Sequence, residues 1–544
     1  MRISKIEAKN YRCFGPDGVQ VVLPFGLVSL VGENNVGKST LIDVASKLLN
    51  NPRNTSVHPT DSYSIDATTP PTVRVECEFT DVEIKEVIEQ WLGPNLQGTS
   101  IGHAEVERFI DLYGRTLAVV RSVNDAGTYV ASVEWGPFKM DGQQLQRIEG
   151  GNGTLSTGAF LAFLHGNEAY DQQASEAAVI ELKTSVDSPM FSITARRLRI
   201  LSDVRSRPSG QGPSGADVNR SLDGTSTADL LMNLKIGDDS QRKLFAEIQE
   251  SFARFYPDLR VEVTGRQGGV AQVVFTQHPF EGDLPQSSVG TGVVEILTLI
   301  TNLVGVSNSV IVVEEPELHL HRMSRVALMR LIKSSSEDNQ IILITHSTEF
   351  VDYQNPSGII RFRKRSGGAH VNPLPVGKTP QAIEALVDAL SLHGASDLVF
   401  ARAAILVEGA TETEFFKALG PRIDKDLEMH NVAVVNMEGD TRFGSYILIC
   451  DALDMPVICL KDLPGKANRG SNASKFVVLG NEIEKYWKDN GLGELLKKGK
   501  AAVGSKHENK PRLGRYMGQH IDPDSVPELL VQVMEEAISA ASPR

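Results

Sequence analysis

The chain has 544 residues, a length that predicts about three domains, or one large and one small domain. Hydrophobic residues make up 41% and charged residues 23%, which is ordinary for a globular protein that buries sizeable cores. The net charge of −13 excludes a uniformly basic coat for nucleic acid, although local basic strips can still bind DNA.

The chain has 4 cysteines, Cys13, Cys77, Cys450 and Cys459, and no CxxC pair. This pattern predicts neither a zinc site nor a disulfide framework. The N-terminal stretch MRISKIEAKNYRCF alternates like a strand and lacks the apolar core of a signal peptide. No apolar run reaches the roughly 20 residues that a membrane span needs, so we expect a cytoplasmic protein without a membrane partner.

Residues 1–80 are predicted to form strands around one helix, which runs from Lys38 to about Leu49. LVGENNVGKST fits G-x-x-x-x-G-K-[ST], with an apolar strand before it and a helix after it. Such a loop surrounds phosphate oxygens with backbone N–H groups at a helix N-terminus. Lys38 is expected to contact the β- and γ-phosphates of ATP, and Ser39 to bind Mg²⁺. The predicted nucleotide-binding residues of this loop are Gly32, Asn35, Gly37, Lys38, Ser39 and Thr40.

Residues 85–255 are less regular. VEIKEVIEQWL and QRKLFAEIQESFARFY (241–256) have helical spacing, and TLAVVRSVNDAGTYVASVEWG is a strand meander. Residues 207–221, RPSGQGPSGADVNRS, are rich in Gly, Ser and Pro and predict a mobile loop.

Three later segments indicate which kind of ATPase this is. The strand in IVVEEPELHLH (311–321) ends in Glu314, a predicted Mg²⁺ ligand through water, and Glu315, which would polarise the attacking water. IILITHS (341–347) ends in His346, which could sense the γ-phosphate. Before a predicted helix, LPQSSVGTGVVEILTLI places Ser288 and Gly290, which could hold a phosphate from another molecule.

Together these segments resemble an ABC-type ATPase head of the kind found in SMC-like DNA-repair proteins. The resemblance covers roughly residues 1–80 and 260–365, and the turn at Ser288 departs from the usual LSGGQ. It implies that two heads enclose ATP between them, and therefore a homodimer or a dimer of dimers. The insert at 85–255 is too short for a long coiled-coil arm, and we expect it to carry a partly helical dimerisation region.

A second pattern begins with ILVEGATETEFF (405–416). Glu408 ends an apolar strand, and Glu412 follows one helical turn later on the same face. Two facing carboxylates repel each other unless a cation such as Mg²⁺ lies between them. The alternative is an ordinary helix N-terminus, where glutamates are favoured by the helix dipole. A further strand, in MPVICLKDLP, ends at Asp462.

The VEGATE motif resembles the first motif of TOPRIM domains, and the ABC head followed by TOPRIM is the arrangement of the OLD (overcoming lysogenization defect) family. The resemblance implies Glu408, Glu412 and Asp462 as ligands of Mg²⁺. Where the TOPRIM pattern has a second aspartate, this chain has Pro464. A proline at this position cannot bind metal and predicts a weaker second site, which would favour Mn²⁺ because Mn²⁺ tolerates imperfect geometry better than Mg²⁺. Downstream, the resemblance maps an acidic ligand to Glu484 and a catalytic lysine to Lys510, the latter within a basic run.

The expected fold is therefore α/β, with an ABC-type ATPase domain at 1–395 and a TOPRIM nuclease domain at 396–544. The Gabija anti-phage nuclease subunit and some retron effectors share this arrangement, which implies a DNA endonuclease or nickase governed by ATP, with a helicase or another defence component as a further partner. Basic segments at 196–207, 361–365 and 497–512 offer paths for DNA or are solvated faces. Two alternatives remain open: an ATPase whose degenerate TOPRIM domain is a DNA-binding scaffold, and a sensor subunit for a partner effector.

Overall fold

The structure is a computed structural model. It describes residues 1–50, 70–92, 100–123, 129–141, 143–182, 188–201, 227–265, 271–277, 282–365, 368–374, 379–463, 474–504 and 506–542. The chain divides into two units. The N-terminal unit comprises Met1–Leu30, Gly37–Phe350 and Gly367–Ala369, and the C-terminal unit comprises Val31–Val36, Val351–Ser366 and His370–Arg544.

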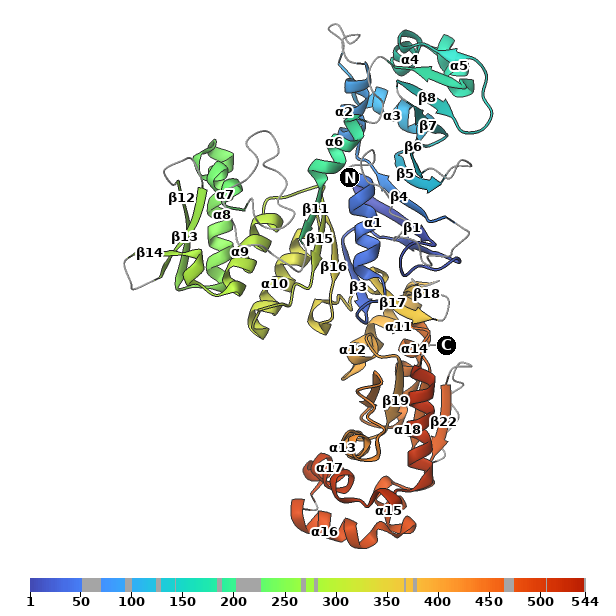
Figure 1. The fold of residues 1–544 in the computed structure, drawn as a ribbon, viewed down its shortest axis with the longest axis vertical. Helices are drawn as coiled ribbons and strands as arrows, with labels where there is room; N and C mark the ends of the chain where they lie inside the picture. Colours follow the sequence, from blue (N-terminus) through green and yellow to red (C-terminus); the bar gives the residue numbers. More distant parts are fainter. Residues whose placement is uncertain are drawn as a thin grey trace. The chain divides into compact units, whose positions relative to one another are not determined.

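The N-terminal part of the chain up to residue 350 contains these elements (Figure 1): β1 (Arg2–Lys9), β2 (Val19–Val22), β3 (Leu27–Gly32), α1 (Lys38–Asn50), β4 (Thr72–Glu78), α2 (Asp81–Leu92), α3 (His103–Tyr113), β5 (Thr116–Val123), β6 (Tyr129–Trp135), β7 (Phe138–Asp141), β8 (Gln144–Arg147), β9 (Thr154–Leu155), α4 (Thr157–Leu164), α5 (Asp171–Glu176), β10 (Val179–Glu181), α6 (Ser188–Arg197), β11 (Leu198–Leu201), α7 (Thr227–Ile236), α8 (Asp239–Phe255), β12 (Leu259–Gly265), β13 (Ala271–Gln277), β14 (Asp283–Pro285), α9 (Thr291–Leu303), β15 (Val310–Glu314), α10 (Arg322–Ser335) and β16 (Gln340–Ile344).

Nine of the described strands form one sheet in the order β2-β1-β4-β5-β6-β7-β8-β10-β9. Neighbouring strands are antiparallel except β10 and β9. The predicted meander is confirmed as β5 and β6, and the two predicted helices as α2 and α8. The region predicted as an insert therefore contributes strands to the same nine-stranded sheet as β1, β2 and β4. It is helical only in part.

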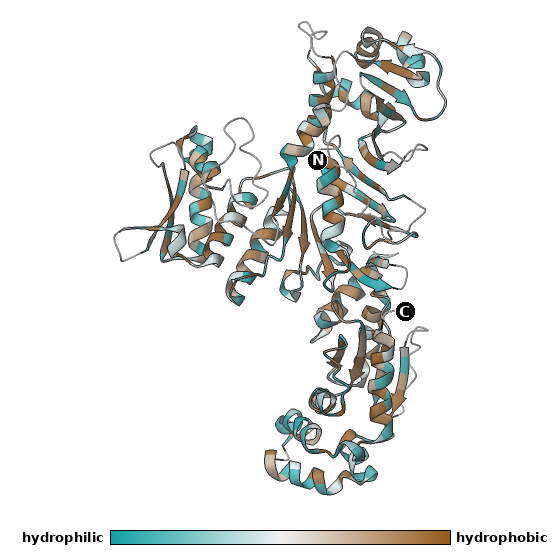
Figure 2. Ribbon diagram, viewed as in Figure 1, coloured by the Kyte–Doolittle hydropathy of each residue, from teal (hydrophilic) through white to brown (hydrophobic). Residues whose placement is uncertain are grey.

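A parallel sheet positions the nucleotide loop. Its strands in the N-terminal unit follow the order β11-β15-β16-β3, with Val312 opposite Ile342 and Ile342 opposite Val28. The strands β15 and β16 are hydrophobic except for Glu314 at the end of β15 and Gln340 at the start of β16 (Figure 2), as expected where helices cover both faces of a sheet.

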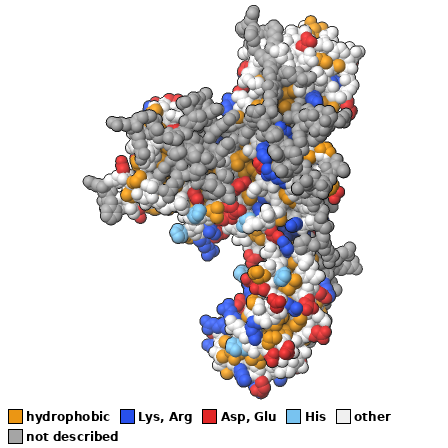
Figure 3. All heavy atoms as spheres, in the orientation of Figure 1, with side chains coloured by type: hydrophobic (Ala, Val, Ile, Leu, Met, Phe, Trp, Pro, Cys, Tyr) orange, Lys and Arg blue, Asp and Glu red, His pale blue; other side chains and the backbone are white. Residues whose placement is uncertain are grey.

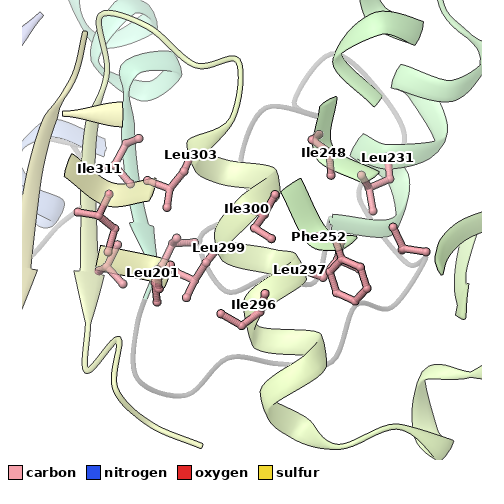
Figure 4. Packing of buried hydrophobic residues seen from close by; sticks show 14 of the residues in the cluster. Leu201, Leu231, Ile248, Phe252, Ile296, Leu297, Leu299, Ile300, Leu303 and Ile311 are labelled. Carbon is pink, nitrogen blue, oxygen red and sulfur yellow. The ribbon is translucent and has the colours of Figure 1, made fainter. Parts of the chain in front are cut away.

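Helix α9 lies between this sheet and the helices α7 and α8 (Figure 4). Leu299 and Leu303 of α9 lie towards Leu201 and Ile311 of the sheet, whereas other apolar residues of α9 pack on the far side. The helix is buried along most of its length because it is apolar on several faces.

From residue 351 onward the structure contains β17 (Ile359–Arg365), β18 (Gly368–Pro373), α11 (Pro380–Leu390), α12 (Ala395–Leu398), β19 (Ala403–Val407), α13 (Ala410–Leu419), β20 (Val432–Asn436), α14 (Phe443–Ala452), β21 (Val457–Lys461), β22 (Ser474–Val478), α15 (Ile483–Trp487), α16 (Gly493–Val503), α17 (Lys510–His520) and α18 (Glu528–Ala541).

Four of these strands form a parallel sheet in the order β20-β19-β21-β22. Alternate residues of β19 enter two different cores. Ala404 and Leu406 pack with α11, α12 and α14, whereas Ile405 and Val407 pack with α13, α17 and α18. Burial on both faces explains why the sequence here is a continuous apolar run.

Two sequence features, the Gly/Ser/Pro-rich stretch 207–221 and Pro464, lie outside the described residues. Of the helices that the structure does describe, none combines the length and the apolar character needed to span a bilayer.

Candidate nucleotide and nuclease sites

The phosphate loop joins β3 to α1, as the sequence predicts. Gly32 and Gly37 have φ angles of +132° and +103°, which disfavour any residue but glycine. A Cβ on Gly37 would lie 2.7 Å from the sulfur of Cys13, and one on Gly32 would clash with the carbonyl oxygen of Phe362. Asn35 also has a positive φ, at 64°.

Lys38, the first residue of α1, is buried, and its Nζ lies 3.1 Å from Nε2 of His346. The same Nε2 lies 3.4 Å from the carboxylate of Glu315. Burial, and then the charge of Lys38, lowers the pKa of His346, so the imidazole is neutral at physiological pH. Three of the predicted ATPase residues thus meet where β15 and β16 end. The half-buried Glu314 is the last residue of β15, and Ser39 is exposed on α1 beside the half-buried Thr40.

Glu317 was not singled out from the sequence, yet it organises this edge. Its buried carboxylate accepts hydrogen bonds from the hydroxyl of Thr345, at 2.9 Å, and from the backbone N–H of His346, at 2.8 Å. The bonds hold His346 at the end of β16. The only signal in the sequence was a third glutamate two residues after Glu315.

The predicted signature turn lies at the N-terminus of α9. Ser288 ends a 3₁₀ turn, Gly290 is the N-cap residue, and both are exposed. A Cβ on Gly292 would clash with the carbonyl oxygen of His319, so the second glycine of the turn allows close packing. The first N–H groups of a helix have no partner within the helix, and such a helix start is a common kind of anion-binding feature.

The carboxylates of the second predicted site lie at the ends of neighbouring parallel strands. Glu408 directly follows β19, and Asp462 directly follows β21. The backbone N–H of Asp462 donates to Oε1 of Glu408 at 3.0 Å. Glu412, in the first turn of α13, is only 4% exposed.

Burial and neighbouring carboxylates raise the pKa of Glu412 and of Asp462. Burial, the largest cause, together with the charges of Asp462 and Glu408, raises the pKa of Glu412 to about 7. Burial and the charge of Glu408 raise the pKa of Asp462 to about 6, with Glu482 adding to the effect. Lys510 opposes both shifts, so its ammonium group is near both carboxylates.

Close packing of two helices brings Lys510 to this site. Lys510 begins α17, and a Cβ on Gly514, one turn later, would clash with the carbonyl oxygen of Thr411 on α13. A Cβ on Gly518 would lie 2.7 Å from the carbonyl oxygen of Phe415. Two glycines four residues apart therefore let α17 approach the backbone of α13.

Glu484, the predicted acidic ligand, is engaged elsewhere. Its Oε2 lies 2.5 Å from Nζ of Lys500 on α16. Of this pair of glutamates, the one whose charge acts on Asp462 is Glu482, two residues earlier. The sequence offered both glutamates and gave no means to choose between them.

The donor set suits a hard divalent cation, because Glu408, Glu412 and Asp462 supply only carboxylate oxygens. Within the described ranges, however, no three His, Cys, Asp or Glu side chains are grouped closely enough to form a ready-made metal site. In this structure Glu408 is hydrogen-bonded to the backbone of Asp462. Metal binding would therefore require the carboxylate side chains to turn towards one another.

The basic segments differ in how much of their charge is available. In the segment 361–365, Arg363 and Arg365 both lie 2.5 Å from a carboxylate oxygen of Asp454. Basic side chains, mixed with acidic ones, cover α16 and α17 (Figure 3), where Lys497 pairs with Glu494. Residues 202–207 of the first segment lie outside the described residues.

Two family profiles match the chain. Residues 181–352 match "AAA domain, putative AbiEii toxin, Type IV TA system". Residues 399–463, which include Glu408, Glu412 and Asp462, match "Overcoming lysogenization defect protein-like, TOPRIM domain". The chain joins a P-loop ATPase domain to an OLD-like TOPRIM domain. The mixed α/β fold with these two domains, predicted from the sequence, is thereby confirmed.

Two relatives carry related names. The chain is 26% identical over 184 residues to the OLD nuclease of Thermus scotoductus, and 28% identical over 166 residues to the Old nuclease of Escherichia phage P2. The matches cover 32% and 29% of this chain. They span only 34% and 28% of the lengths of those relatives.

Solved structures give weaker likenesses. An SMC head bound to the C-winged helix domain of ScpA is 14% identical, with a TM-score of 0.39, and the match covers 68% of this chain and 97% of that one. The C-terminal region of the Burkholderia pseudomallei OLD protein is 17% identical, with a TM-score of 0.23. That match covers 26% of this chain and all of the other.

Proposed function

We propose that this protein is a nucleotide-regulated DNA endonuclease or nickase that depends on a divalent metal. The observation that carries the proposal is the group formed by Glu408, Glu412, Asp462 and Lys510 at the carboxyl ends of β19 and β21. A buried and a half-buried acid with raised pKa values beside a lysine are typical of a site that binds a cation and a phosphodiester. The names of the two OLD nuclease relatives support the same activity.

In the nuclease site, each residue has a distinct role. Glu408, Glu412 and Asp462 would bind Mg²⁺ or Mn²⁺, and a bound cation would supply Lewis-acid activation of water and charge neutralisation at the phosphate. Lys510 would stabilise the negative charge that builds up on the scissile phosphate. Glu482 is a candidate outer ligand, in place of the predicted Glu484.

In the ATPase site, Lys38 would hold the β- and γ-phosphates of ATP, while Ser39 and Glu314 hold Mg²⁺. Glu315 would orient the attacking water, and His346 would contact the γ-phosphate. Ser288 and Gly290 would complete the nucleotide site of a second copy, which makes the protein a homodimer or a dimer of dimers. We place the domain boundary near residue 395, and propose DNA as the substrate and anti-phage defence or DNA processing as the setting.

The test is a plasmid-nicking assay on the full chain with Mg²⁺ or Mn²⁺, with and without ATP, beside the variants Glu408→Ala and Lys38→Ala. Nicking that Glu408→Ala removes and that nucleotide modulates through Lys38 is the expected result. Metal-independent nicking, or nicking that survives Glu408→Ala, would contradict the proposal.

A second function is favoured by one observation, the lack of a ready-made ligand set among the described carboxylates. An ATPase whose TOPRIM domain only binds DNA would shift DNA in a binding assay and leave plasmids intact with both metals.

A further inference from the structure

A polar cavity of about 310 Å³ opens beside β11 in the N-terminal unit, apart from both sites described above. One wall carries Arg196 and Arg197, from the last turn of α6, and Arg199, from β11. The other wall is the turn between α9 and β15, which includes Val306, Ser307 and Ser309. The cavity thus uses the described arginines of the basic segment that begins at residue 196.

Arg199 has the least compensated charge of the three. Arg199 is half-buried. Its Nη1 donates to the side-chain oxygen of Asn302 at 3.4 Å, and its Nε is buried with no hydrogen-bond partner. Burial, and then the charge of Arg197, lowers its pKa. Within the described residues no carboxylate lies in ion-pair distance of Arg199. A half-buried cation in this state favours an anion at its side, because an uncompensated charge is costly away from water.

The other two arginines are each paired with a glutamate of α2. Arg197 lies 3.2 Å from Glu83, and Arg196 is hydrogen-bonded to Glu86. Among the described residues, three guanidinium groups therefore face two carboxylates, which leaves a net positive charge on this part of the cavity. Arg197 also donates to the carbonyl oxygen of Ser307, which fixes it on the cavity rim.

We propose that this cavity binds a phosphate group of the DNA backbone. Guanidinium groups match phosphate oxygens in geometry and charge. The exposed Ser307 adds a hydroxyl donor, whereas the hydroxyl of Ser309 already donates to the carbonyl oxygen of Ser307. A free nucleotide carries the same phosphate chemistry. Among the described residues that line the cavity, however, there is no aromatic ring on which a base could stack, and Val306 is the only one with an apolar side chain. A backbone phosphate needs no such ring. The choice of DNA rests on the proposed function, whereas the affinity for phosphate does not.

The first test compares Arg199→Met with Arg254→Met, which removes an exposed arginine from the last turn of α8, both in the full chain carrying Glu408→Ala so that DNA stays intact. Anisotropy of a labelled duplex of about 30 base pairs is titrated at several salt concentrations. Arg199→Met should weaken binding by ~10-fold or more, as for a lost charge-assisted hydrogen bond. In a plot of the logarithm of the DNA association constant against the logarithm of the salt concentration, the slope for Arg199→Met should be smaller in magnitude than that of the parent protein by about 0.9. Equal affinities and slopes for the two variants would overturn the proposal.

Thermal unfolding separates this role from a structural one and distinguishes the sources of phosphate. Arg199→Met should leave the Tm unchanged or raise it, because it removes a half-buried charge that has no carboxylate partner among the described residues. Inorganic phosphate, compared with chloride at equal ionic strength, should raise the Tm of the parent protein more than that of Arg199→Met. A large fall in Tm for Arg199→Met without any phosphate effect would make the arginine structural and overturn the proposal.

Three further outcomes are decisive. If phosphate or ATP stabilises the protein through Arg199 while DNA affinity does not change, the cavity serves a free phosphate compound and the DNA assignment is wrong. If polyglutamate competes as strongly as DNA at matched charge, the occupant is an acidic protein, and the assignment is again wrong. If the parent protein binds no DNA, the proposed nuclease function fails, and the phosphate titration alone then decides whether the cavity binds phosphate.

Discussion

Glu33 in the phosphate loop is bound to Arg402, the residue that precedes the first TOPRIM strand, by two side-chain hydrogen bonds. Burial alone would raise the pKa of Glu33, but the hydrogen bonds and charge of Arg402 outweigh it and hold that pKa below its usual range. The neighbouring guanidinium of Arg361, fully buried on β17, donates to the carbonyl oxygens of Ala401 and Leu453. The loop that would hold ATP is thereby tied to the strand that ends in Glu408.

We predict that this ion pair transmits nucleotide binding to the nuclease site. In Arg402→Gln the ratio of nicking rates with and without ATP should move towards one, because the loop and β19 lose their charged link, while ATP hydrolysis continues. Arg422→Gln, which changes an arginine that donates to the backbone of α17, is the comparison for general destabilisation of the TOPRIM domain. An unchanged ATP ratio in Arg402→Gln would exclude the role.

The pH dependence of the pair has a definite sign. Since the pKa of Glu33 is lower in the folded protein than in the unfolded chain, the pair stabilises above the ordinary glutamate pKa, and the stability is lost as the pH falls through the folded-state value. In thermal unfolding, Glu33→Gln should therefore lower the Tm at neutral pH and have less effect in acid.

Binding and hydrolysis of ATP should separate in two variants. Lys38→Ala should abolish nucleotide binding, because the ammonium that contacts the phosphates is gone. Glu315→Gln should still bind ATP and lose hydrolysis by roughly 10²-fold or more, as for loss of a general base. Fluorescent-nucleotide binding and phosphate release measure the two steps, and wild-type hydrolysis by Glu315→Gln would make the assignment of the base wrong.

Assembly should depend on the exposed turn at Ser288. In the Glu315→Gln background, ATP should accumulate between two heads and shift the mass measured by light scattering to that of a dimer or tetramer. Ser288→Arg should prevent the shift by steric and charge conflict at the phosphate. A monomer at micromolar concentration with and without ATP would contradict the two-head arrangement.

Lys510 and Lys506 lie in the same basic run but in different surroundings. The charge of Lys510 acts on Glu412 and Asp462. Lys506 is exposed, and its Nζ forms a long ion pair of 3.9 Å with Glu508. Lys510→Ala should lower DNA turnover by roughly 10²-fold while DNA affinity falls far less. Lys506→Ala should leave turnover near that of the wild type. Equal losses of binding and cleavage in Lys510→Ala would make it part of a solvated basic face.

Metal binding at the TOPRIM site should strengthen as the pH rises. The pKa of Glu412, about 7, is above that of an unfolded glutamate, so the metal-free protein loses stability as the pH rises from the ordinary value to about 7. A divalent cation replaces the proton, so the Tm gain with Mg²⁺ or Mn²⁺ should grow over the same range. The full chain and its Glu408→Ala variant are compared by thermal shift, and identical metal responses would refute the site.

The features that could be predicted from the sequence are those that depend on residues close together in the chain. Apolar runs placed β19 and β21, and with them Glu408 and Asp462 at adjacent strand ends. Contacts between distant segments gave no such signal. The role of Glu317 depends on its hydrogen bond from Thr345, which directly follows β16. The choice between Glu482 and Glu484 depends on the position of Lys500 on α16, which pairs with Glu484. Both contacts are determined by the tertiary fold.

The Arg199 cavity and the Glu33–Arg402 pair could not be predicted from the sequence for the same reason. Periodicity reports which face of an element is buried, but it does not report which other element covers that face. A run of arginines such as the one at residue 196 therefore has the same appearance whether it is solvated or lines a cavity.

Gly514 and Gly518 determine how closely α17 approaches α13, and this distance affects the chemistry of the site. Since α17 rests directly on the backbone of α13, the width of a single methyl group at either glycine would push the helix outward and carry the ammonium of Lys510 away from the carboxylates. These two glycines have no charge, no hydrogen-bonding side chain and no access to a substrate. They nevertheless set the distance between the ammonium group of Lys510 and the carboxylates, and with it the strength of their electrostatic interaction. A substitution there would have the kinetic signature of a lost catalytic group although every polar residue of the site is intact.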